Sequence, residues 1–171
     1  MVGECNMAKW KFEGLNAYVT QLKTLENGAE SAIKKAVYTG ADIVANSIRA
    51  KINALPVERT PKASSGKLLT GVTKLEKKGL LDGFGISTFQ DDDGYINVKM
   101  GFHGYNQIKT KKYPKGQPNA MIARSVVRGT SVRIRIPFVA NATRHAKGGA
   151  EEQMRKVLDE EIRAQLKKQG G

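Results

Sequence analysis

Residues 119–142, NAMIARSVVRGTSVRIRIPFVANA, contain three successive backbone patterns. Apolar residues recur at helical spacing in the first part, and Gly129 stands where such a helix would end. Residues 132–136 then alternate Val or Ile with Arg, which is typical of a strand with one buried face. Pro137 ends pairing in a sheet but suits the first turn of a helix. The stretch therefore predicts a helix, a break, a strand and a second helix.

Two long helices are predicted on either side of the middle of the chain. Residues 29–55 are amphipathic and rich in alanine, so they permit close approach of another element, and Pro56 ends the pattern. From Pro137 to the C-terminus the apolar residues again keep helical spacing, and Gly148-Gly149 gives this second helix a place to bend.

The residues before and after the first long helix predict smaller elements. Residues 1–7 read as an unstructured extension, residues 10–13 as a short strand, and residues 15–25 as a first helix. Residues 56–66 are rich in Pro, Thr, Ser and Lys and predict a loop. The leucines and valine of 68–75 suggest one or two helical turns that pack on the core.

Residues 83–102 predict a β-hairpin. Apolar residues alternate on both sides of Asp91-Asp92-Asp93-Gly94, and an Asp-Gly pair suits the tight turn. The three aspartates lack the spacing and terminal glutamate of a calcium loop, so we interpret them as turn residues. Residues 103–118 hold four lysines, two glycines and two prolines and predict a long, mobile, basic loop.

Together these patterns predict one α+β domain over residues 1–171. In it, a small antiparallel β-sheet, built on the hairpin and joined by a strand over 132–136, is covered by the 29–55 helix and the C-terminal helix. The length suits one hydrophobic core rather than two. No apolar run approaches the length of a membrane span, and the first residues lack the features of a secretory signal, so we expect a soluble chain that is not exported.

Positive charge is concentrated in one third of the chain. The net charge is +13, and residues 94–150 contain no Asp or Glu but eleven basic residues: Lys99, Lys109, Lys111, Lys112, Lys115, Arg124, Arg128, Arg133, Arg135, Arg144 and Lys147. Such a one-sided distribution indicates either a surface that faces a polyanion or an acidic protein, or a solvated face that serves solubility.

Catalytic and cofactor chemistry find little support. One cysteine and two histidines cannot form a disulfide framework or a zinc site. Ser65-Gly66-Lys67-Leu68 lacks the first glycine and the magnesium-binding hydroxyl of a phosphate-binding loop, and Gly79, Gly83 and Gly85 do not form a dinucleotide-binding pattern. No nucleophile, base and orienting acid can be assembled. We expect no enzyme, no cofactor, no bound metal and no small-molecule substrate.

The order of short blocks along the chain resembles a family of tail-assembly proteins from long-tailed bacteriophages and prophages, the gene-product-ten-like family of phage Hong Kong ninety-seven. The blocks are Phe12-Glu13-Gly14-Leu15, Ser65-Gly66-Lys67-Leu68, Ile122-Ala123, Gly129-Thr130-Ser131 and Pro137-Phe138. Departures occur at Val127-Arg128, where the family often has a glutamate and an aromatic residue, and at Asn141-Ala142, where it has proline-alanine. Each block is short, whereas their order and spacing are more specific.

The resemblance implies a small α+β structural subunit of the virion, assembled in the bacterial cytoplasm. Such a subunit completes the tail and joins it to the head, as a ring of identical copies at the neck. Its implied partners are other copies of itself, other neck and tail proteins, and DNA passing through the channel. The residues we select as partner or DNA contacts are Lys109, Lys111, Lys112, Lys115, Arg124, Arg128, Arg133 and Arg135. The alternative function, supported by charge alone, is a basic nucleic-acid-binding protein.

Overall fold

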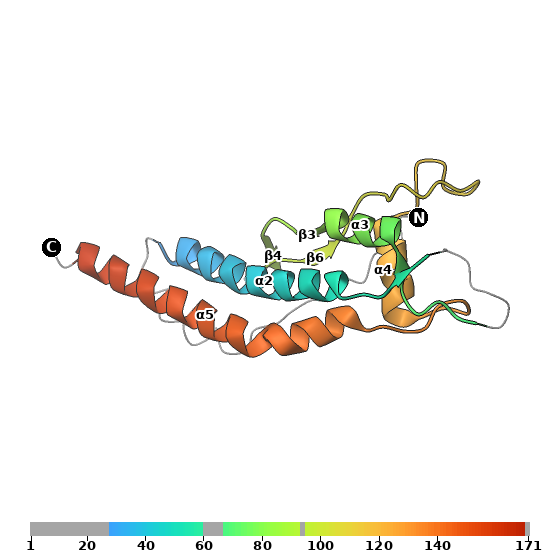
Figure 1. Cartoon of the computed structure of the whole chain (residues 1–171). Helices are drawn as coiled ribbons and strands as arrows, with labels where there is room; N and C mark the ends of the chain where they lie inside the picture. The colour runs from blue at the N-terminus through green and yellow to red at the C-terminus, as the bar shows by residue number, and fades with distance from the viewer. Residues whose placement is uncertain (1–27, 60–66, 93–94, 170–171) are drawn as a thin grey trace.

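The computed structural model describes residues 28–59, 67–92 and 95–169 and confirms the α+β class. In chain order the elements are α2 (Ala29–Asn53), β1 (Val57–Glu58), β2 (Val72–Thr73), α3 (Lys74–Gly83), β3 (Phe84–Ile86), β4 (Gln90–Asp92), β5 (Tyr95–Asn97), β6 (Met100–Phe102), α4 (Asn119–Arg128) and α5 (Phe138–Gln169). The molecule is elongated, with α2 and α5 side by side along its length and α3 and α4 toward one end (Figure 1).

Helices α2 and α5 form an antiparallel pair whose contact is made by small residues. On α2 the buried small residues are Ala32, Ala36, Gly40, Ala41 and Ala45. Gly40 has no room for a side chain, because an added Cβ would lie 2.4 Å from Met154 Sδ on α5. Farther along the pair, the Ser47 hydroxyl donates to the Ala142 carbonyl (3.1 Å). The alanine-rich face predicted for this helix thus allows the close approach that buries it.

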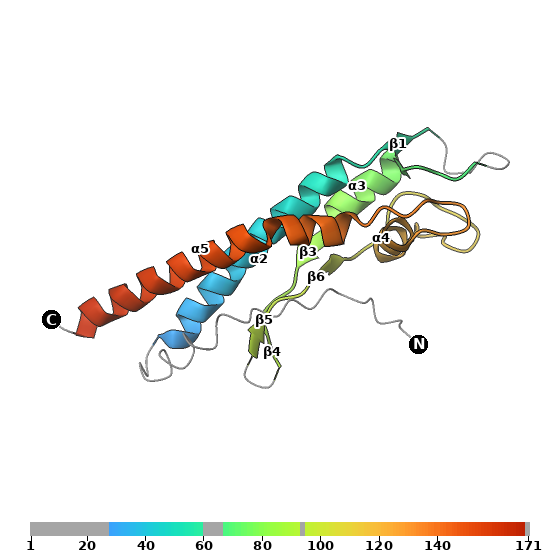
Figure 2. The same ribbon diagram turned by 90° about the horizontal axis from the view of Figure 1, so that it is seen from below.

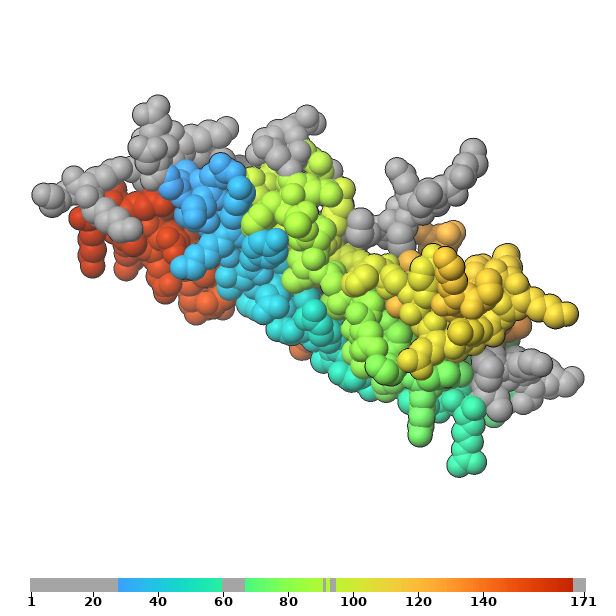
Figure 3. Space-filling model, turned by 90° about the horizontal axis from the view of Figure 1, so that it is seen from above, coloured from blue at the N-terminus to red at the C-terminus, as the bar shows by residue number. Residues whose placement is uncertain are grey.

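Figure 2, a view from below, shows where the other elements lie relative to this helix pair. The hairpin strands lie against the pair, and α3 and α4 sit near the C-terminal end of α2 and the start of α5 (Figure 2). The space-filling view shows α2, α3 and segment 103–118 in succession along one face (Figure 3). The larger core cluster joins α2, α3, β3, α4 and α5, and the smaller one joins the N-terminal half of α2 to the C-terminal half of α5.

The predicted hairpin forms, with one extra residue in its first strand. β3 pairs with β6 from Phe84 opposite Phe102, and β4 pairs with β5 from Gln90 opposite Asn97. Between these two ladders the first strand has three residues, 87–89, and the second has two, 98–99. The Ser87 hydroxyl accepts the Lys99 N–H there (2.9 Å), which satisfies a backbone donor at this bulge. The turn residues 93–94 lie outside the described residues.

An aromatic cluster fastens the hairpin to the long helices. The Phe102 ring lies 5.2 Å from Phe84 and 6.2 Å from Phe138, between ring centroids. Phe138 is the first residue of α5 and directly follows Pro137, as the sequence predicted. α5 is continuous through Gly148 and Gly149 and curves along its length (Figure 1).

The helix α4 and its end are also as predicted. α4 spans Asn119–Arg128, and Gly129 follows it with a φ of 75°, a conformation that favours glycine. Isolated backbone bridges, rather than a strand, follow this glycine. Residues 132–136 do not form the predicted strand: only Arg133 makes bridges, one to Leu69 and one to Thr130.

Two other expectations need correction or lie outside the description. The short helix expected over 68–75 is wrong in position, because Leu69 forms a bridge, β2 follows, and α3 begins only at Lys74. The start of the predicted 56–66 loop includes β1, which pairs in parallel with β2. The predicted N-terminal extension, strand and first helix, together with residues 60–66, lie outside the described residues.

We predict that Gly79→Ala lowers the free energy of unfolding although Gly79 lies inside α3. Alanine in a helix interior is normally favoured over glycine by about 0.5–1 kcal/mol. Here an added Cβ would lie 2.5 Å from Asn119 Oδ1 and 2.7 Å from Asn106 Cβ. Such crowding costs about 1–3 kcal/mol. Urea unfolding would measure the change.

The matched control is Gly149→Ala, because nothing lies within 4 Å of the added Cβ there. We expect this variant to raise the free energy of unfolding by about 0.5–1 kcal/mol. Equal stabilisation by both substitutions would contradict the close contact of α3 with Asn106 and Asn119.

Candidate interaction surface

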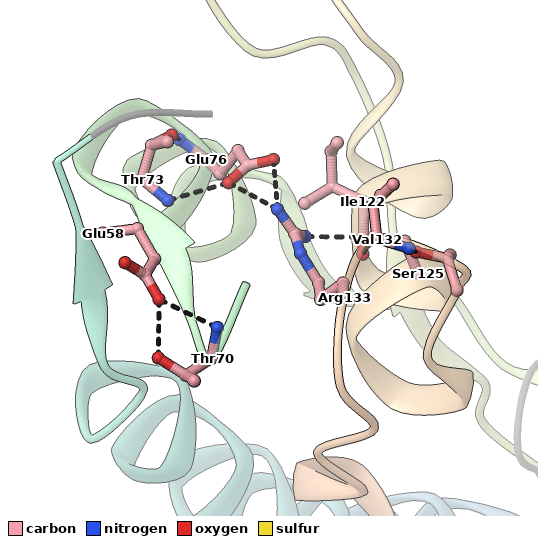
Figure 4. A network of polar contacts seen from close by, with 9 residues as sticks. Glu58, Thr70, Thr73, Glu76, Ile122, Ser125, Val132 and Arg133 are labelled. Carbon is pink, nitrogen blue, oxygen red and sulfur yellow. Dashed lines mark hydrogen bonds and ion pairs between the residues drawn. The ribbon is translucent and has the colours of Figure 1, made fainter. Parts of the chain in front are cut away.

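We term the part of the molecule that carries the exposed Lys109, Lys111, Lys112, Lys115, Arg124, Arg128 and Arg135 the basic end. It is organised around one buried arginine, Arg133. Arg133 Nη2 lies 2.8 Å from Glu76 Oε1 and 3.0 Å from Oε2, and Nη1 donates to Ser125 Oγ at 3.0 Å (Figure 4). The side chains of Arg133 and Glu76 are only 6% and 5% exposed. The prediction that Arg133 contacts a partner or DNA is therefore wrong, because its guanidinium is buried and already bound.

Glu76 is held in place by the first turn of α3. Thr73 and Glu76 form a capping box, in which the Glu76 N–H donates to Thr73 Oγ1 (3.2 Å) and the Thr73 N–H donates to Glu76 Oε2 (2.7 Å). One carboxylate thus satisfies a free N–H at the helix start and neutralises the buried arginine. A buried charge requires such a partner, because an unpaired one is strongly unfavourable.

This ion pair sets the orientation of residues 132–134. Because Arg133 points inward, the residues on either side of it point outward: Val132 is 51% and Ile134 39% exposed. The sequence predicted both Arg133 and Arg135 as surface contacts; Arg135 is exposed as expected, whereas Arg133 is buried. The departure is local to Arg133 and its two neighbours, because Arg135 is exposed and Ile136 packs partly buried against the core.

The other seven predicted contact residues are exposed. Lys109, Lys111, Lys112 and Lys115 lie in the loop, Arg124 and Arg128 lie on α4, and Arg135 lies before α5. α4 buries Ile122 and Val126, so the two arginines, four residues apart, share its solvent-facing side. None of these seven cations has an acidic partner within the described part of the chain.

The base of the basic loop is fixed by two buried asparagines. Asn106 Oδ1 accepts the N–H groups of Ile108 (2.9 Å) and Gln117 (3.0 Å), which ties the two arms of the loop together. Asn119 Nδ2 donates to the His103 carbonyl (2.9 Å). The two asparagines pack against Gly79 and Gly83 of α3, so the base of the loop has a defined position on the domain.

Acidic side chains elsewhere are mostly engaged by their own chain. Ion pairs along the long helices are Glu30–Lys34, Lys35–Glu161, Lys147–Glu151 and Glu152–Lys156, and Asp82 pairs with Lys78 on α3. Hydrogen bonds from the Thr70 hydroxyl and N–H to Glu58 lower the pKa of that carboxyl. The exposed Asp159 and Glu160 share α5 with Arg155, Lys156 and Arg163. The described surface therefore has a basic end without a matching acidic end.

Two features are absent from the described residues. No helix there is long and apolar enough to cross a membrane, and no group of three or more His, Cys, Asp or Glu residues there is placed to hold a metal ion. Comparisons of the chain with models of protein families, with curated proteins and with solved structures found no match.

Sequence reasoning missed the residues that build this end of the molecule. Glu76 had a readable signal, because Thr73 and Glu76 have the spacing of a capping box. Asn106 and Asn119 had none, since nothing in a lysine-rich loop marks which asparagine is buried. Glu76, Asn106 and Asn119 are buried, and they hold the segments that carry the exposed cations.

We predict that Arg133→Met is strongly destabilising, by about 3–5 kcal/mol, because it leaves the Glu76 carboxylate buried without a counter-charge. The neighbouring Arg135→Met is the matched control and should change stability by less than about 0.5 kcal/mol, since Arg135 is exposed and unpaired. Equilibrium denaturation of both variants checks this. Similar small effects of the two substitutions would exclude a structural role for the ion pair.

The mobility expected for the basic loop stays a prediction, and the contacts of Asn106 sharpen it. In the isolated protein, we expect the amides of Lys111 and Lys112, which have no hydrogen-bond acceptor, to exchange fastest with solvent. The amides of Ile108 and Gln117 should exchange more slowly, and Asn106→Ala should abolish that difference at Ile108 but only reduce it at Gln117, whose N–H also donates to the Ile108 carbonyl (3.1 Å). Hydrogen exchange measured by NMR gives each rate. Strong protection across 104–118 in a monomer would refute loop mobility.

Proposed function

We propose that this chain is a structural subunit of the tail or neck of a long-tailed bacteriophage or prophage, located in the virion. It acts in tail completion and head–tail joining as a ring of identical copies. The observation that carries the proposal is the basic end: seven exposed cations, from the loop, α4 and the segment before α5, that have no acidic partner among the described residues. No catalytic role is assigned.

Three of the blocks behind the family resemblance lie within the described residues, and they occupy positions that the fold requires. Gly129 has the positive φ that ends α4, Thr130 forms the bridge to Arg133, and Phe138 is buried in the aromatic cluster. Residues needed for backbone geometry and core packing are the ones expected to persist among related chains. Their order supports a shared fold with the tail-assembly proteins, and the function follows from that resemblance as a proposal.

The charge distribution separates two kinds of contact in such a ring. Two basic ends would repel each other, so neighbouring copies would meet through other surfaces. The basic end is then left for a different molecule, an acidic protein of the neck or tail or the DNA that passes through it. A ring subunit needs both kinds of surface.

The second candidate function is a free nucleic-acid-binding protein, and the seven unpaired cations favour it. Such a protein would neutralise several phosphates together, so its affinity for duplex DNA would fall steeply and linearly with the logarithm of the salt concentration. Tight binding of the isolated protein to DNA of any sequence at physiological salt would favour this function over assembly.

We predict that replacing Lys109, Lys111, Lys112 and Lys115 with Gln spares the fold but impairs the joining of heads to tails. The fold is spared because exposed, unpaired lysines contribute little to stability. Joining is impaired because the loop loses the positive charge that complements the acidic partner. Electron microscopy and infectivity of particles carrying the variant measure joining, and thermal unfolding measures stability.

The matched control removes four cations from the other part of the molecule: Arg155, Lys156, Arg163 and Lys167→Gln, all on α5. It should leave joining intact, because it changes the net charge equally without touching the basic end. Fully joined, infectious particles from the loop variant would remove the loop from the proposed mechanism.

A further inference from the structure

Three exposed aliphatic side chains gather around the backbone bridge between Leu69 and Arg133. The bridge pairs Leu69 with Arg133 in parallel, through hydrogen bonds from Leu69 N to Val132 O (2.8 Å) and from Ile134 N to Leu69 O (2.9 Å). Leu69 and Arg133 point inward, so the residues beside them point outward on one face. Leu68, Val132 and Ile134 are 44%, 51% and 39% exposed, and they form what we term the aliphatic patch.

The side chains of the aliphatic patch cannot become buried by a local rearrangement of the chain. Val132 and Ile134 can turn inward only if Arg133 turns outward, and that would leave the Glu76 carboxylate buried without its partner. The ion pair therefore holds two β-branched side chains in solvent. A cluster of exposed aliphatic groups on a charged surface is typical of a contact site for another protein.

Cations flank the aliphatic patch in both segments that build it. Lys67 precedes Leu68, Arg135 follows Ile134, and both are exposed. Glu58 is the acid close to Lys67, which contributes to lowering the Glu58 pKa, but its carboxylate is already engaged by the Thr70 hydroxyl (2.6 Å) and N–H (2.8 Å). An occupant of the patch must therefore combine apolar side chains with acidic ones.

A second copy of the chain and duplex DNA fit this description less well. On the long helices, Glu30, Glu151, Glu152 and Glu161 are paired with cations. Asp42 accepts a hydrogen bond from Asn46, and Asp159 and Glu160 lie on α5 near Arg155, Lys156 and Arg163, so a second copy offers few free carboxylates. Duplex DNA supplies negative charge along its phosphates but would leave the aliphatic side chains without apolar contact outside a groove. An acidic protein segment satisfies both the apolar and the charged groups.

We propose that the aliphatic patch and its flanking cations dock a short segment of a different protein in which acidic side chains alternate with large apolar ones. The apolar side chains cover Leu68, Val132 and Ile134, and the carboxylates meet Lys67 and Arg135. This names the partner class of the basic end and rests on the proposed function only for where that partner occurs.

Two synthetic peptides of equal length and charge test the proposal with the full chain. In one, Leu alternates with Glu; in the other, Ser alternates with Glu. We expect the purified protein to bind the Leu–Glu peptide at least about tenfold more tightly, as measured by fluorescence anisotropy, because only this peptide covers aliphatic surface. The double variant V132S/I134S should bind both peptides equally. Lys67→Gln with Arg135→Gln should weaken binding of both.

The control variant is L166S, which removes a leucine of 51% exposure near the C-terminal end of α5. It should keep the preference for the Leu–Glu peptide. Circular dichroism and thermal unfolding should show that V132S/I134S remains folded, since both residues are exposed. If that variant were unfolded, V132T/I134T, which keeps the β-branched shape, would take its place in the same measurement.

Three results would overturn the proposal: no preference for the Leu–Glu peptide, duplex DNA binding at physiological salt that V132S/I134S weakens, or self-association that V132S/I134S abolishes. The second would assign the patch to nucleic acid and the third to another copy of the chain. Peptide binding is measured without particles, so it can fail while head–tail joining still depends on the loop lysines.

Discussion

The buried ion pair between Glu76 and Arg133 is the constraint on which the basic end of this molecule depends. It joins the first turn of α3 to the segment before α5 and, through Ser125, to α4. Buried ion pairs add little net stability over apolar packing, because desolvation offsets their attraction. Losing one partner is costly, however. The pair therefore disfavours arrangements in which α3, α4 and the segment before α5 separate. Its contribution is to select one arrangement of the surface around it.

The rest of the molecule is a scaffold that holds this end in place. α2 and α5 approach closely through alanine and glycine, and their exposed charges pair across and along the helices. At the end of α2, Lys77 Nζ donates to the carbonyls of Asn53 (2.6 Å) and Leu55 (3.0 Å), which caps the helix with a residue from α3. The helix pair, α3 and the basic end are thereby connected by specific contacts rather than by the chain alone.

Most of the elements could be predicted because their signals are local. α2, α4 and α5 repeat apolar residues at helical spacing, and Gly129 and Pro137 mark where helices end and begin. The hairpin follows from alternation around an Asp-Gly pair. The position of α3 could not be read from the apolar residues of 68–75, because their spacing does not mark where the helix begins. The capping pattern of Thr73 and Glu76 marks that start. Of the eight cations chosen as contacts, seven are on the surface and Arg133 is buried.

The sequence by itself determined the fold class, the long helices, the hairpin and the one-sided basic charge, because each depends on spacing or composition within a short stretch. Only the tertiary structure decided which side chains of 132–136 are buried. Alternation does not say which side chain a buried partner will bind, and the inward turn of Arg133 depends on Glu76, which is 57 residues away in sequence. The same long-range contact turned a predicted surface arginine into a core residue and left Val132 and Ile134 in solvent, where they form the aliphatic patch.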